Sequence, residues 1–176
     1  RFDGSNDVVT GADVPIKSSS FTIATWAKRE AAGRAEYLVS QGTNESNKDL
    51  YMGFWSSDRF VCAFDTSTYL VTAASYTDTD WHHWACTFDP YSGKRTIYRD
   101  GAQVAQDTTG YVYQGTGSLR IGRARWGAYW KGSIDELAVW PDALSADDVK
   151  LLYQKIKALD DSVTECLIGR PSPDAF

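Results

Sequence analysis

The segment from residue 119 to residue 153 constrains the fold more than any other part of the chain, because two strand-like runs, a loop and one helix follow one another within it. Residues 119–121 and 134–140 are rich in apolar side chains and are bounded by glycine, which is typical of β-strands. Ser145 is a favourable N-cap, and Asp148 stands three residues later, as in a capping box. The segment therefore predicts a β-rich domain that ends in one short helix.

Two further runs alternate apolar side chains in the way that strands with one buried face do. Phe60, Cys62 and Phe64 would point to one side of their strand, and the run 84–88 repeats this pattern. Short runs separated by turn residues, with 14 glycines and an aromatic content of 14%, favour a sandwich. We therefore expect an all-β fold, a two-sheet antiparallel jelly-roll sandwich with about six or seven strands in each sheet.

Several short motifs occur in a recognisable order along the chain. They lie at residues 2–9, 21–27, 81–89 with 97–101, 132–137 and 144–145. In this order they resemble the laminin G-like domains of the concanavalin A-like lectin/glucanase superfamily. The resemblance extends from residue 2 to about residue 157 and implies a β-sandwich domain over residues 1–159. Because this fold serves lectins, adhesion modules and glycosidases, the resemblance predicts the fold more strongly than the function.

The end of the chain differs in composition from the rest. Residues 160–176 are largely polar and include Pro171 and Pro173, which is typical of a linker or an extended coil. We predict a C-terminal tail or linker here, and both a simple chain end and a connection to a further domain stay open. The chain starts with Arg1 rather than methionine, so we expect a mature form or a piece of a longer protein.

Charge and hydropathy exclude two classes of partner. The formal net charge is −5, whereas a nucleic-acid-binding domain needs a basic footprint on phosphate. No apolar run approaches the roughly 20 residues of a membrane span. We therefore expect neither nucleic-acid binding nor membrane insertion, and the remaining partners are a glycan, an extracellular protein, or other domains and chains of a larger assembly.

The chain has three cysteines, Cys62, Cys86 and Cys166. Cys62 and Cys86 each stand among core-facing apolar residues, which favours two small buried thiols. The alternative is one disulfide, for example between Cys166 and the body of the domain, or a bond from Cys166 to another chain.

The residues needed for catalysis are not found in a suitable pattern. A retaining glycosidase needs two carboxylates about 5–5.5 Å apart. Asp135 and Glu136 are adjacent in a predicted strand and would point to opposite faces, as would His82 and His83, the only two histidines. We therefore expect that the chain is not an enzyme, and a glycoside hydrolase or lyase is the third candidate function.

A calcium ion is implied by the resemblance. Many relatives of this fold hold one structural ion where the first strand's turn meets the last strand. The corresponding ligands here would include Asp3 and Asp135, with backbone oxygens nearby such as that of Gly4, and Asp7 is a further candidate. Calcium is bound by six to eight oxygens from carboxylates, carbonyls and water. The alternative is that Asp3 accepts hydrogen bonds within its own turn and that Asp135 pairs with a base.

Aromatic residues in two predicted loops are the candidate ligand-binding residues. Trp126 and Tyr129 lie in a loop with Arg123 and Arg125, and Trp55 lies at a predicted hairpin tip. Flat aromatic rings at loop tips suit stacking on sugars, with charged side chains on the hydroxyl groups. The same residue types also dominate protein interfaces, and they could equally fold back over the edge of the core.

The other tryptophans are interpreted as structural. Trp26, Trp81, Trp84 and Trp140 stand in strand-like runs and are expected in the core, while Trp130 corresponds to a large aromatic residue packed under the sheet in relatives. The function expected from the sequence is a non-catalytic, extracellular or cell-surface, carbohydrate- or ligand-binding module of a larger protein. The alternative is a structural or assembly domain that acts through protein–protein contacts.

Overall fold

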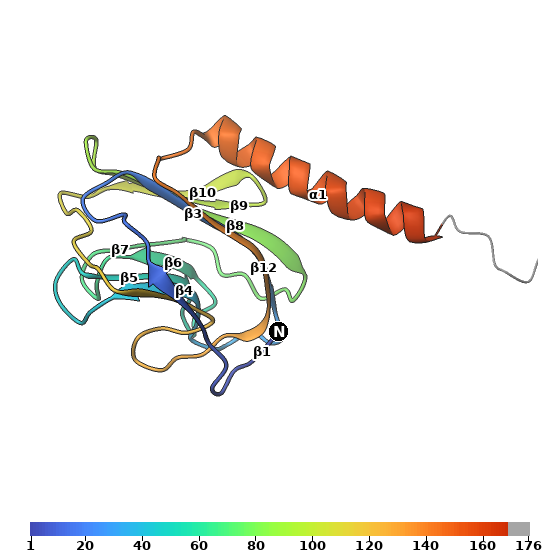
Figure 1. Cartoon of the computed structure of the whole chain (residues 1–176), viewed down its shortest axis with the longest axis horizontal. Helices are drawn as coiled ribbons and strands as arrows, with labels where there is room; N and C mark the ends of the chain where they lie inside the picture. Colours follow the sequence, from blue (N-terminus) through green and yellow to red (C-terminus); the bar gives the residue numbers. More distant parts are fainter. Residues whose placement is uncertain (169–176) are drawn as a thin grey trace, which may run out of the picture.

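The chain folds into a sandwich of two six-stranded antiparallel sheets (Figure 1). The computed structural model describes residues 1–168, with side chains described as far as residue 158. Sheet A contains, in spatial order, β1 (Phe2–Asp3), β12 (Lys131–Trp140), β3 (Phe21–Arg29), β8 (Trp81–Asp89), β9 (Lys94–Arg99) and β10 (Ala102–Thr108). Sheet B contains β2 (Val9–Asp13), β11 (Ser118–Ile121), β4 (Glu36–Gly42), β5 (Asp49–Phe54), β6 (Phe60–Ala63) and β7 (Tyr69–Val71). This architecture confirms the predicted all-β sandwich.

The core between the sheets is rich in aromatic rings. Phe60 of β6 and Trp84 of β8 stack across it with ring centroids 4.0 Å apart and planes at 7°. Trp130, expected under the sheet, is completely buried there. The predicted alternation is also confirmed, because Phe60, Cys62 and Phe64 face this core while Val61, between the first two, packs on the outer face of sheet B.

A disulfide joins the two sheets, and this corrects one expectation. Cys62 of β6 and Cys86 of β8 are bonded to each other, with their Cα atoms 6.5 Å apart. The interpretation of these residues as free buried thiols is therefore wrong. Alternation placed both side chains in the core but could not show that they lie opposite each other across it. The side chain of Cys166 lies outside the described residues.

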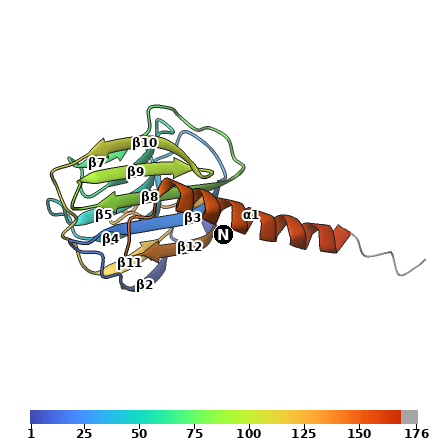
Figure 2. The same cartoon turned by 90° about the horizontal axis from the view of Figure 1, so that it is seen from above.

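A single helix, α1 (Ala146–Ile168), follows the last strand, and its start is capped as expected. The Ser145 hydroxyl accepts a hydrogen bond from the Asp148 amide, and the Asp148 carboxylate accepts one from the Ser145 amide, both at 3.2 Å. The first turns of α1 lie on the outer face of sheet A, where Val149 is buried against Ala24, Ala85 and Tyr98 (Figure 2). Among the described residues, no helix is both long and apolar enough to cross a membrane.

The helix continues beyond residue 159, where the sequence predicted the end of the domain. Residues 160–168 are helical, and the division into a domain of residues 1–159 and a tail of residues 160–176 stays a prediction.

The tryptophans expected in the core occupy three different places. Trp84 lies between the sheets and is 2% exposed. Trp26 and Trp140 instead lie half-buried on the outer face of sheet A, where Trp26 stacks on Tyr153 of α1 and Trp140 packs beside the start of the helix. Trp81 is 40% exposed, so the prediction of a core position is wrong for it. Alternation within β8 explains this, because Trp81 is three residues before the inward-facing Trp84 and therefore points to the outer face, at the end of the strand beside Lys28.

Candidate functional site

The outer face of sheet B carries a row of aromatic side chains that point away from the core. Tyr37 of β4 and Tyr51 of β5 project from this face and are buried by neighbouring side chains, at 4% exposure each. Their rings meet edge to face, with centroids 5.4 Å apart. Gly53 lies opposite Tyr37 in the ladder, and a Cβ atom there would clash with the Glu36 carbonyl oxygen and the Tyr37 Cα atom and lie 3.0 Å from the Tyr37 ring. The missing side chain therefore lets the backbones of β4 and β5 approach each other closely beside the Tyr37 ring.

Trp126 packs on these two tyrosines from the connection between β11 and β12. Its ring centroid lies 5.0 Å from that of Tyr37 and 5.0 Å from that of Tyr51, in both cases nearly perpendicular. The side chain nevertheless keeps 43% exposure. Ala124 and Ala128 of the same connection pack on this face, and the Ala124 amide donates to the Ala128 carbonyl at 2.9 Å. Trp126 is thus held in place on one side and open to solvent on the other.

A second aromatic pair extends the same row. Trp55 follows β5 in the hairpin that leads to β6, as predicted, and packs edge to face on Tyr69 of β7 at 5.0 Å between centroids. Tyr69 is 43% exposed. Tyr51, Ala63 and Tyr69 are partners across three neighbouring strands, so their side chains share one face. The aromatic strip, as we call Tyr37, Tyr51, Trp55, Tyr69 and Trp126, therefore crosses the outer face of β4 to β7.

A charged pair lies at one end of the aromatic strip. Arg125 donates to the Asp49 carboxylate from Nε at 3.1 Å and from Nη2 at 3.0 Å, and Nη2 also donates to the Asn44 side-chain oxygen at 2.8 Å. The guanidinium group of Arg125 lies over the Trp126 ring, 5.5 Å from its centroid. Arg125 thus connects the polar residues at the start of β5 to the exposed tryptophan.

Burial affects the titration of both the acid and the tyrosines. Desolvation raises the pKa of Asp49, although the nearby Arg125 opposes this effect. Its second oxygen, Oδ1, is buried and has no hydrogen-bond partner in the described part of the chain. Burial, aided by the charge of Asp49, raises the pKa of Tyr37 to about 12 and raises that of Tyr51 still further. Both hydroxyl groups therefore keep their protons at neutral pH.

Arg123 and Tyr129 close the base of the loop that carries Trp126. The two residues form an isolated antiparallel bridge, and the Arg123 guanidinium lies 5.2 Å from the centroid of the Tyr129 ring. Of the five predicted ligand-binding residues, the structure thus brings Trp55, Arg125 and Trp126 onto the outer face of sheet B. It places the other two, Arg123 and Tyr129, opposite each other at the base of the loop, where they hold its two ends together.

The predicted calcium ligands do not come together as one site. Asp3 Oδ1 accepts hydrogen bonds from the amides of Ser5 and Asn6, which is the alternative interpretation of an Asx turn around Gly4. Asp3 pairs with Lys131, four positions before Asp135 on β12, and at the rise of a strand this separation is about 13 Å. The described residues contain no group of three or more His, Cys, Asp or Glu that could hold a metal ion. The predicted ligand set therefore does not fit a single ion, and calcium binding stays a prediction.

Two carboxylates do lie close together elsewhere, around His82. Its ring nitrogens are 2.7 Å from Asp78 and 2.7 Å from Asp100, and Arg99 donates to Asp78 at 2.8 Å. The adjacent cavity, which Trp84 helps to line, has a volume of about 10 Å³, enough for one water molecule and not for a sugar. Within the described residues this cluster therefore joins a loop to sheet A, and it offers no room for a glycosidic substrate. That the chain is not an enzyme stays a prediction.

Four residues of the site were not singled out from the sequence. Asp49 and Tyr51 alternate on β5 with the core residues Leu50 and Met52, and this pattern was a usable signal for an outward-facing pair. Tyr37 precedes a register shift in β4, after which Leu38 and Val39 are both in the core, and Tyr69 begins a strand of three residues, so no comparable alternation marks the outer face at either position. The role of Tyr37 depends on Trp126, in a loop more than 80 residues away in the chain, whereas Tyr69 packs on Trp55 of a neighbouring hairpin.

Comparison with known proteins agrees with this fold. The laminin G-like family model described as the concanavalin A-like lectin/glucanases superfamily matches residues 3–150. The chain therefore belongs to this superfamily as a laminin G-like domain, which confirms the resemblance seen in the sequence. No curated protein sequence matches closely enough to count as a relative.

Many solved structures have a similar fold, and three of them come from proteins of different origin. A carbohydrate-binding module, CBM40, of the Ruminococcus gnavus IT-sialidase, bound to α2,3-sialyllactose, has 17% identity and a TM-score of 0.68, over 86% of this chain and 96% of that one. Domain 4 of the Geobacillus stearothermophilus arabinanase AbnA, in complex with arabinotriose, has 17% identity and a TM-score of 0.67, over 87% of both chains. A heptameric SAP-like pentraxin from Limulus polyphemus has 18% identity and a TM-score of 0.63, over 85% and 78%. Similarity at this level of identity shows the fold alone.

Proposed function

We propose that this domain is a non-catalytic, lectin-like module that binds carbohydrate through the aromatic strip on the outer face of sheet B. The observation that carries the proposal is Trp126, a 43% exposed ring held edge-on by two buried tyrosines and flanked by the Arg125–Asp49 pair. Such a ring offers a fixed apolar surface to the C–H face of a sugar, and its rigidity lowers the entropic cost of binding.

The polar groups beside the ring supply what a sugar needs in addition to stacking. The partly exposed Arg125 has donors that face both Asp49 and Asn44. Sugar hydroxyl groups both donate and accept hydrogen bonds, so a few such groups next to an apolar platform fix the orientation of the ligand. Two of the structurally similar proteins carry a bound oligosaccharide, which supports a carbohydrate as the ligand class.

An extracellular or cell-surface location is part of the proposal. It rests on the disulfide between Cys62 and Cys86, because disulfides persist in oxidising compartments and are rare in the cytosol. The module would then belong to a larger surface or secreted protein.

The proposal is tested by comparing two tryptophans of similar exposure, Trp126 on the outer face of sheet B and Trp81 in sheet A, at 43% and 40%. Wild type, Trp126→Ala and Trp81→Ala are screened on an array of neutral and acidic glycans, and hits are measured by calorimetry. We expect Trp126→Ala to lose at least about tenfold in affinity, equivalent to about 1.4 kcal/mol, and Trp81→Ala to bind like wild type. Absence of any glycan ligand, or equal losses in both variants, would contradict the proposal.

The alternative is a structural or assembly domain that uses the same strip against protein. It is favoured by the composition of the strip, since tryptophan, tyrosine and arginine dominate the energy of protein interfaces. Self-association or capture of an extracellular partner that Trp126→Ala abolishes, without any glycan binding, would support this alternative.

Calcium is tested separately, because the predicted ligands do not share one site. A rise in the melting temperature on addition of calcium, reversed by a chelator and lost in Asp3→Asn, would support a site at the first turn. An unchanged melting temperature would contradict the prediction that calcium stabilises the domain.

A further inference from the structure

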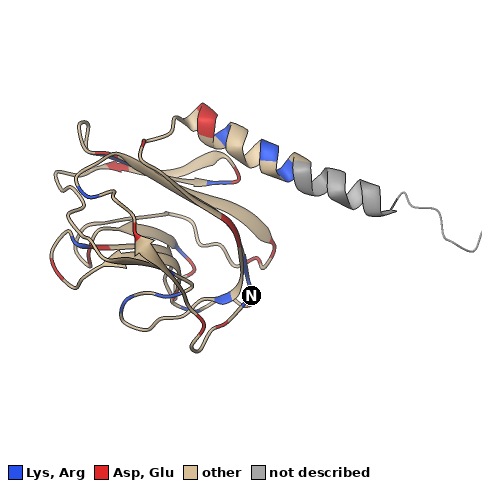
Figure 3. Cartoon of the chain, viewed as in Figure 1, with Lys and Arg blue, Asp and Glu red and all other residues tan. Residues whose placement is uncertain are grey.

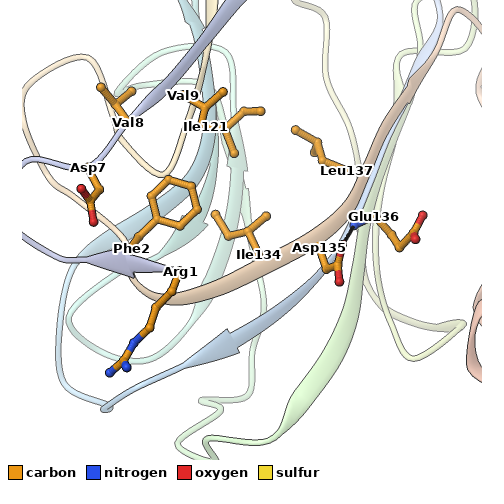
Figure 4. Close-up of a pocket in the computed structure, with 10 residues that line it drawn as sticks. All are labelled: Arg1, Phe2, Asp7, Val8, Val9, Ile121, Ile134, Asp135, Glu136 and Leu137. Atoms are coloured by element: carbon orange, nitrogen blue, oxygen red, sulfur yellow. Dashed lines mark hydrogen bonds between the residues drawn. The ribbon is translucent and has the colours of Figure 1, made fainter. Parts of the chain in front are cut away.

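A wide crevice and a small inner cavity differ in the polar groups that line them. The crevice, of about 440 Å³, lies open beside β1 and β12 (Figure 4). Arg1 and Asp7, two of its charged lining residues, already pair with other protein groups, at 3.1 Å and 2.9 Å. The inner cavity, of about 10 Å³, is lined by core residues such as Trp84, and two of its lining residues carry buried donors that have no partner in the described part of the chain. The inner cavity is therefore the better candidate for a site that the fold itself maintains.

Arg29 of β3 carries the first of these donors, and its other nitrogens are held by protein acceptors. Nε donates to the Glu36 carboxylate at 2.7 Å, while Nη1 donates to the Tyr76 carbonyl at 3.0 Å and lies 2.9 Å from the Asp58 carboxylate. The guanidinium group lies over the Phe54 ring, 4.2 Å from its centroid. Arg29 is 4% exposed, and its remaining nitrogen, Nη2, has no acceptor among the described residues. The guanidinium group is therefore fixed, with one donor nitrogen left over.

Trp130 carries the second donor. Its side chain is completely buried, and within residues 1–158 its Nε1 has no acceptor. The Trp130 ring lies beside the Phe54 ring that Arg29 covers, with ring centroids 6.2 Å apart, and both Trp130 and Arg29 line the inner cavity. Buried donors in proteins are rarely left unpaired, because desolvation without a hydrogen bond costs free energy. Two such donors on one cavity therefore indicate a small acceptor inside it.

The size and the lining of the inner cavity fit a water molecule. A cavity of roughly this volume holds one water, which needs about two to four polar partners. Besides the two donors, Asp78 and Asp80 also line the cavity. A water molecule accepts two hydrogen bonds and donates two, whereas a carboxylate only accepts them. One water therefore satisfies both buried donors and finds acceptors for its own protons.

A halide ion is the other small acceptor, and the charges around the cavity oppose it. Figure 3 shows acidic and basic residues interspersed over the sandwich, so the nearest charges decide. The charge of Arg29 is already balanced by Glu36 at 2.7 Å and Asp58 at 2.9 Å. Asp80, an exposed acid, adds negative charge at the cavity. An anion would be repelled there, whereas a neutral water is not.

We propose that the inner cavity binds one water molecule, which accepts hydrogen bonds from Trp130 Nε1 and Arg29 Nη2 and donates to a carboxylate at the cavity mouth. The water connects three parts of the fold, namely β3 through Arg29, the start of β12 through Trp130, and the connection from β7 to β8 through Asp78 or Asp80. The site is separate from the aromatic strip, which lies on the outer face of sheet B.

The first experiment is a high-resolution crystal structure of the domain, with a second crystal grown in sodium bromide. The expected result is one solvent peak about 2.9 Å from both Trp130 Nε1 and Arg29 Nη2. The bromide crystal should show no anomalous peak at this position. An anomalous peak there would identify an anion site and overturn the proposal of water.

The second experiment detects the water in solution. In a ¹⁵N-labelled sample, the indole proton of Trp130 is assigned from the signal that Trp130→Phe removes, and its cross-peak to water is recorded in NOESY and ROESY spectra. We expect cross-peaks of opposite sign in the two spectra, as for a water that stays bound while the protein tumbles. Cross-peaks of equal sign would indicate proton exchange or a freely diffusing water and would contradict a bound molecule.

The third experiment fills the inner cavity. Ala27 of β3 lines the cavity and is 3% exposed, so Ala27→Val places additional methyl groups in it. We expect the cross-peak between Trp130 and water to disappear. Ala24→Val is the matched control and should keep the cross-peak, because Ala24 is on the same strand and equally buried but lies on the outer face of sheet A under α1. If Ala27→Val does not fold, the wild-type spectra and crystals still decide the question.

Two further results would overturn the proposal. One is an inner cavity without a solvent peak, with Trp130 Nε1 or Arg29 Nη2 bonded directly to a protein acceptor. The other is a cross-peak between Trp130 and water that persists in Ala27→Val. None of these results bears on glycan binding at Trp126, because the inner cavity and the aromatic strip share no residue.

Discussion

Two aromatic regions lie on the two faces of sheet B and differ in what surrounds them. Between the sheets, Trp84 is 2% exposed and stacks on Phe60 at 4.0 Å. On the outer face, Trp126 is 43% exposed and touches Tyr37 and Tyr51 only through edge-to-face contacts at 5.0 Å. The inner ring has all of its surface in contact with protein, whereas the outer ring is fixed on one side and free on the other. The same residue type therefore stabilises the fold in one place and is available to a ligand in the other.

The covalent and polar groups near the two regions also divide into a stabilising group and an accessible one. A disulfide between Cys62 and Cys86 crosses the inner region and joins the sheets. The outer region has the Arg125–Asp49 ion pair, with side-chain exposures of 25% and 3%. The disulfide stabilises the fold because it restricts the conformations open to the unfolded chain. The partly exposed Arg125 can instead move its hydrogen bonds from Asp49 to a ligand.

The largest effect is expected from truncating the inner ring. Trp84→Ala removes a fully buried aromatic side chain and leaves a cavity, which costs about 3–5 kcal/mol of unfolding free energy. Trp126→Ala, the matched change on the outer face, should cost less than about 1 kcal/mol. Chemical denaturation of both variants measures the unfolding free energy that each has lost. Equal losses would contradict the view that only the inner ring stabilises the fold.

A slightly smaller effect is expected from the disulfide. The double variant Cys62→Ala, Cys86→Ala loses the cross-link between the sheets, whose closure of a loop with a sequence separation of 24 is worth about 2–4 kcal/mol. Thermal denaturation of the wild type with and without reductant measures the same loss of stability without a substitution. Glycan affinity at 25 °C should be unchanged, and a loss of affinity in the folded variant would connect the two regions.

The sequence predicted the inner region well and the outer region only in part. Alternation identified Phe60, Cys62 and Phe64 as core-facing, because burial of one strand face leaves a period of two in the sequence. The capping box at Ser145 was equally local and is confirmed. Local patterns of this kind do not depend on which strands become neighbours.

The features that were missed depend on long-range placement. The bond from Cys62 to Cys86 requires two strands of opposite sheets to lie across from each other. Tyr37 and Tyr51 became part of the site only when a loop folded back over them. Trp126 itself was singled out from the sequence, because it lies in a predicted loop beside Arg125, where a flat aromatic ring suits stacking on a sugar.

A pH-dependent effect of similar size is expected on the outer face of sheet A, where side chains are covered by α1. Burial lowers the pKa of His83 from 6.5 to about 4, beside Trp26 and Tyr153. The unfolded chain therefore binds the proton first, and the stability given by the neutral ring is complete above pH 6.5 and lost as the pH falls toward about 4. This lowering of the His83 pKa corresponds to about 3 kcal/mol of unfolding free energy between the two ends of the pH range. Denaturation from pH 8 to pH 4 should show a shallower decline in His83→Gln than in wild type, and identical slopes would contradict this assignment.

The smallest effect is expected from breaking the outer ion pair. Arg125→Gln leaves the buried Asp49 carboxylate without its cation, which should cost about 1–3 kcal/mol and raise the pKa of Asp49 further. Asp49→Asn in the same background should recover part of this loss, because the amide removes the unpaired charge. A double-mutant cycle from urea denaturation measures the coupling, and a coupling of zero would contradict an energetic role for the pair.

The central claim is that the exposed ring on the outer face of sheet B, and not the buried rings, meets the ligand. The most direct test is ¹⁹F NMR of the domain with all seven tryptophans replaced by 5-fluorotryptophan, titrated with the best glycan from the array. We predict that the resonance of Trp126 shifts most, that of Trp55 shifts less, and those of Trp84, Trp130 and Trp81 stay in place. A shift confined to Trp81, or a saturating titration that leaves Trp126 unmoved, would contradict the account.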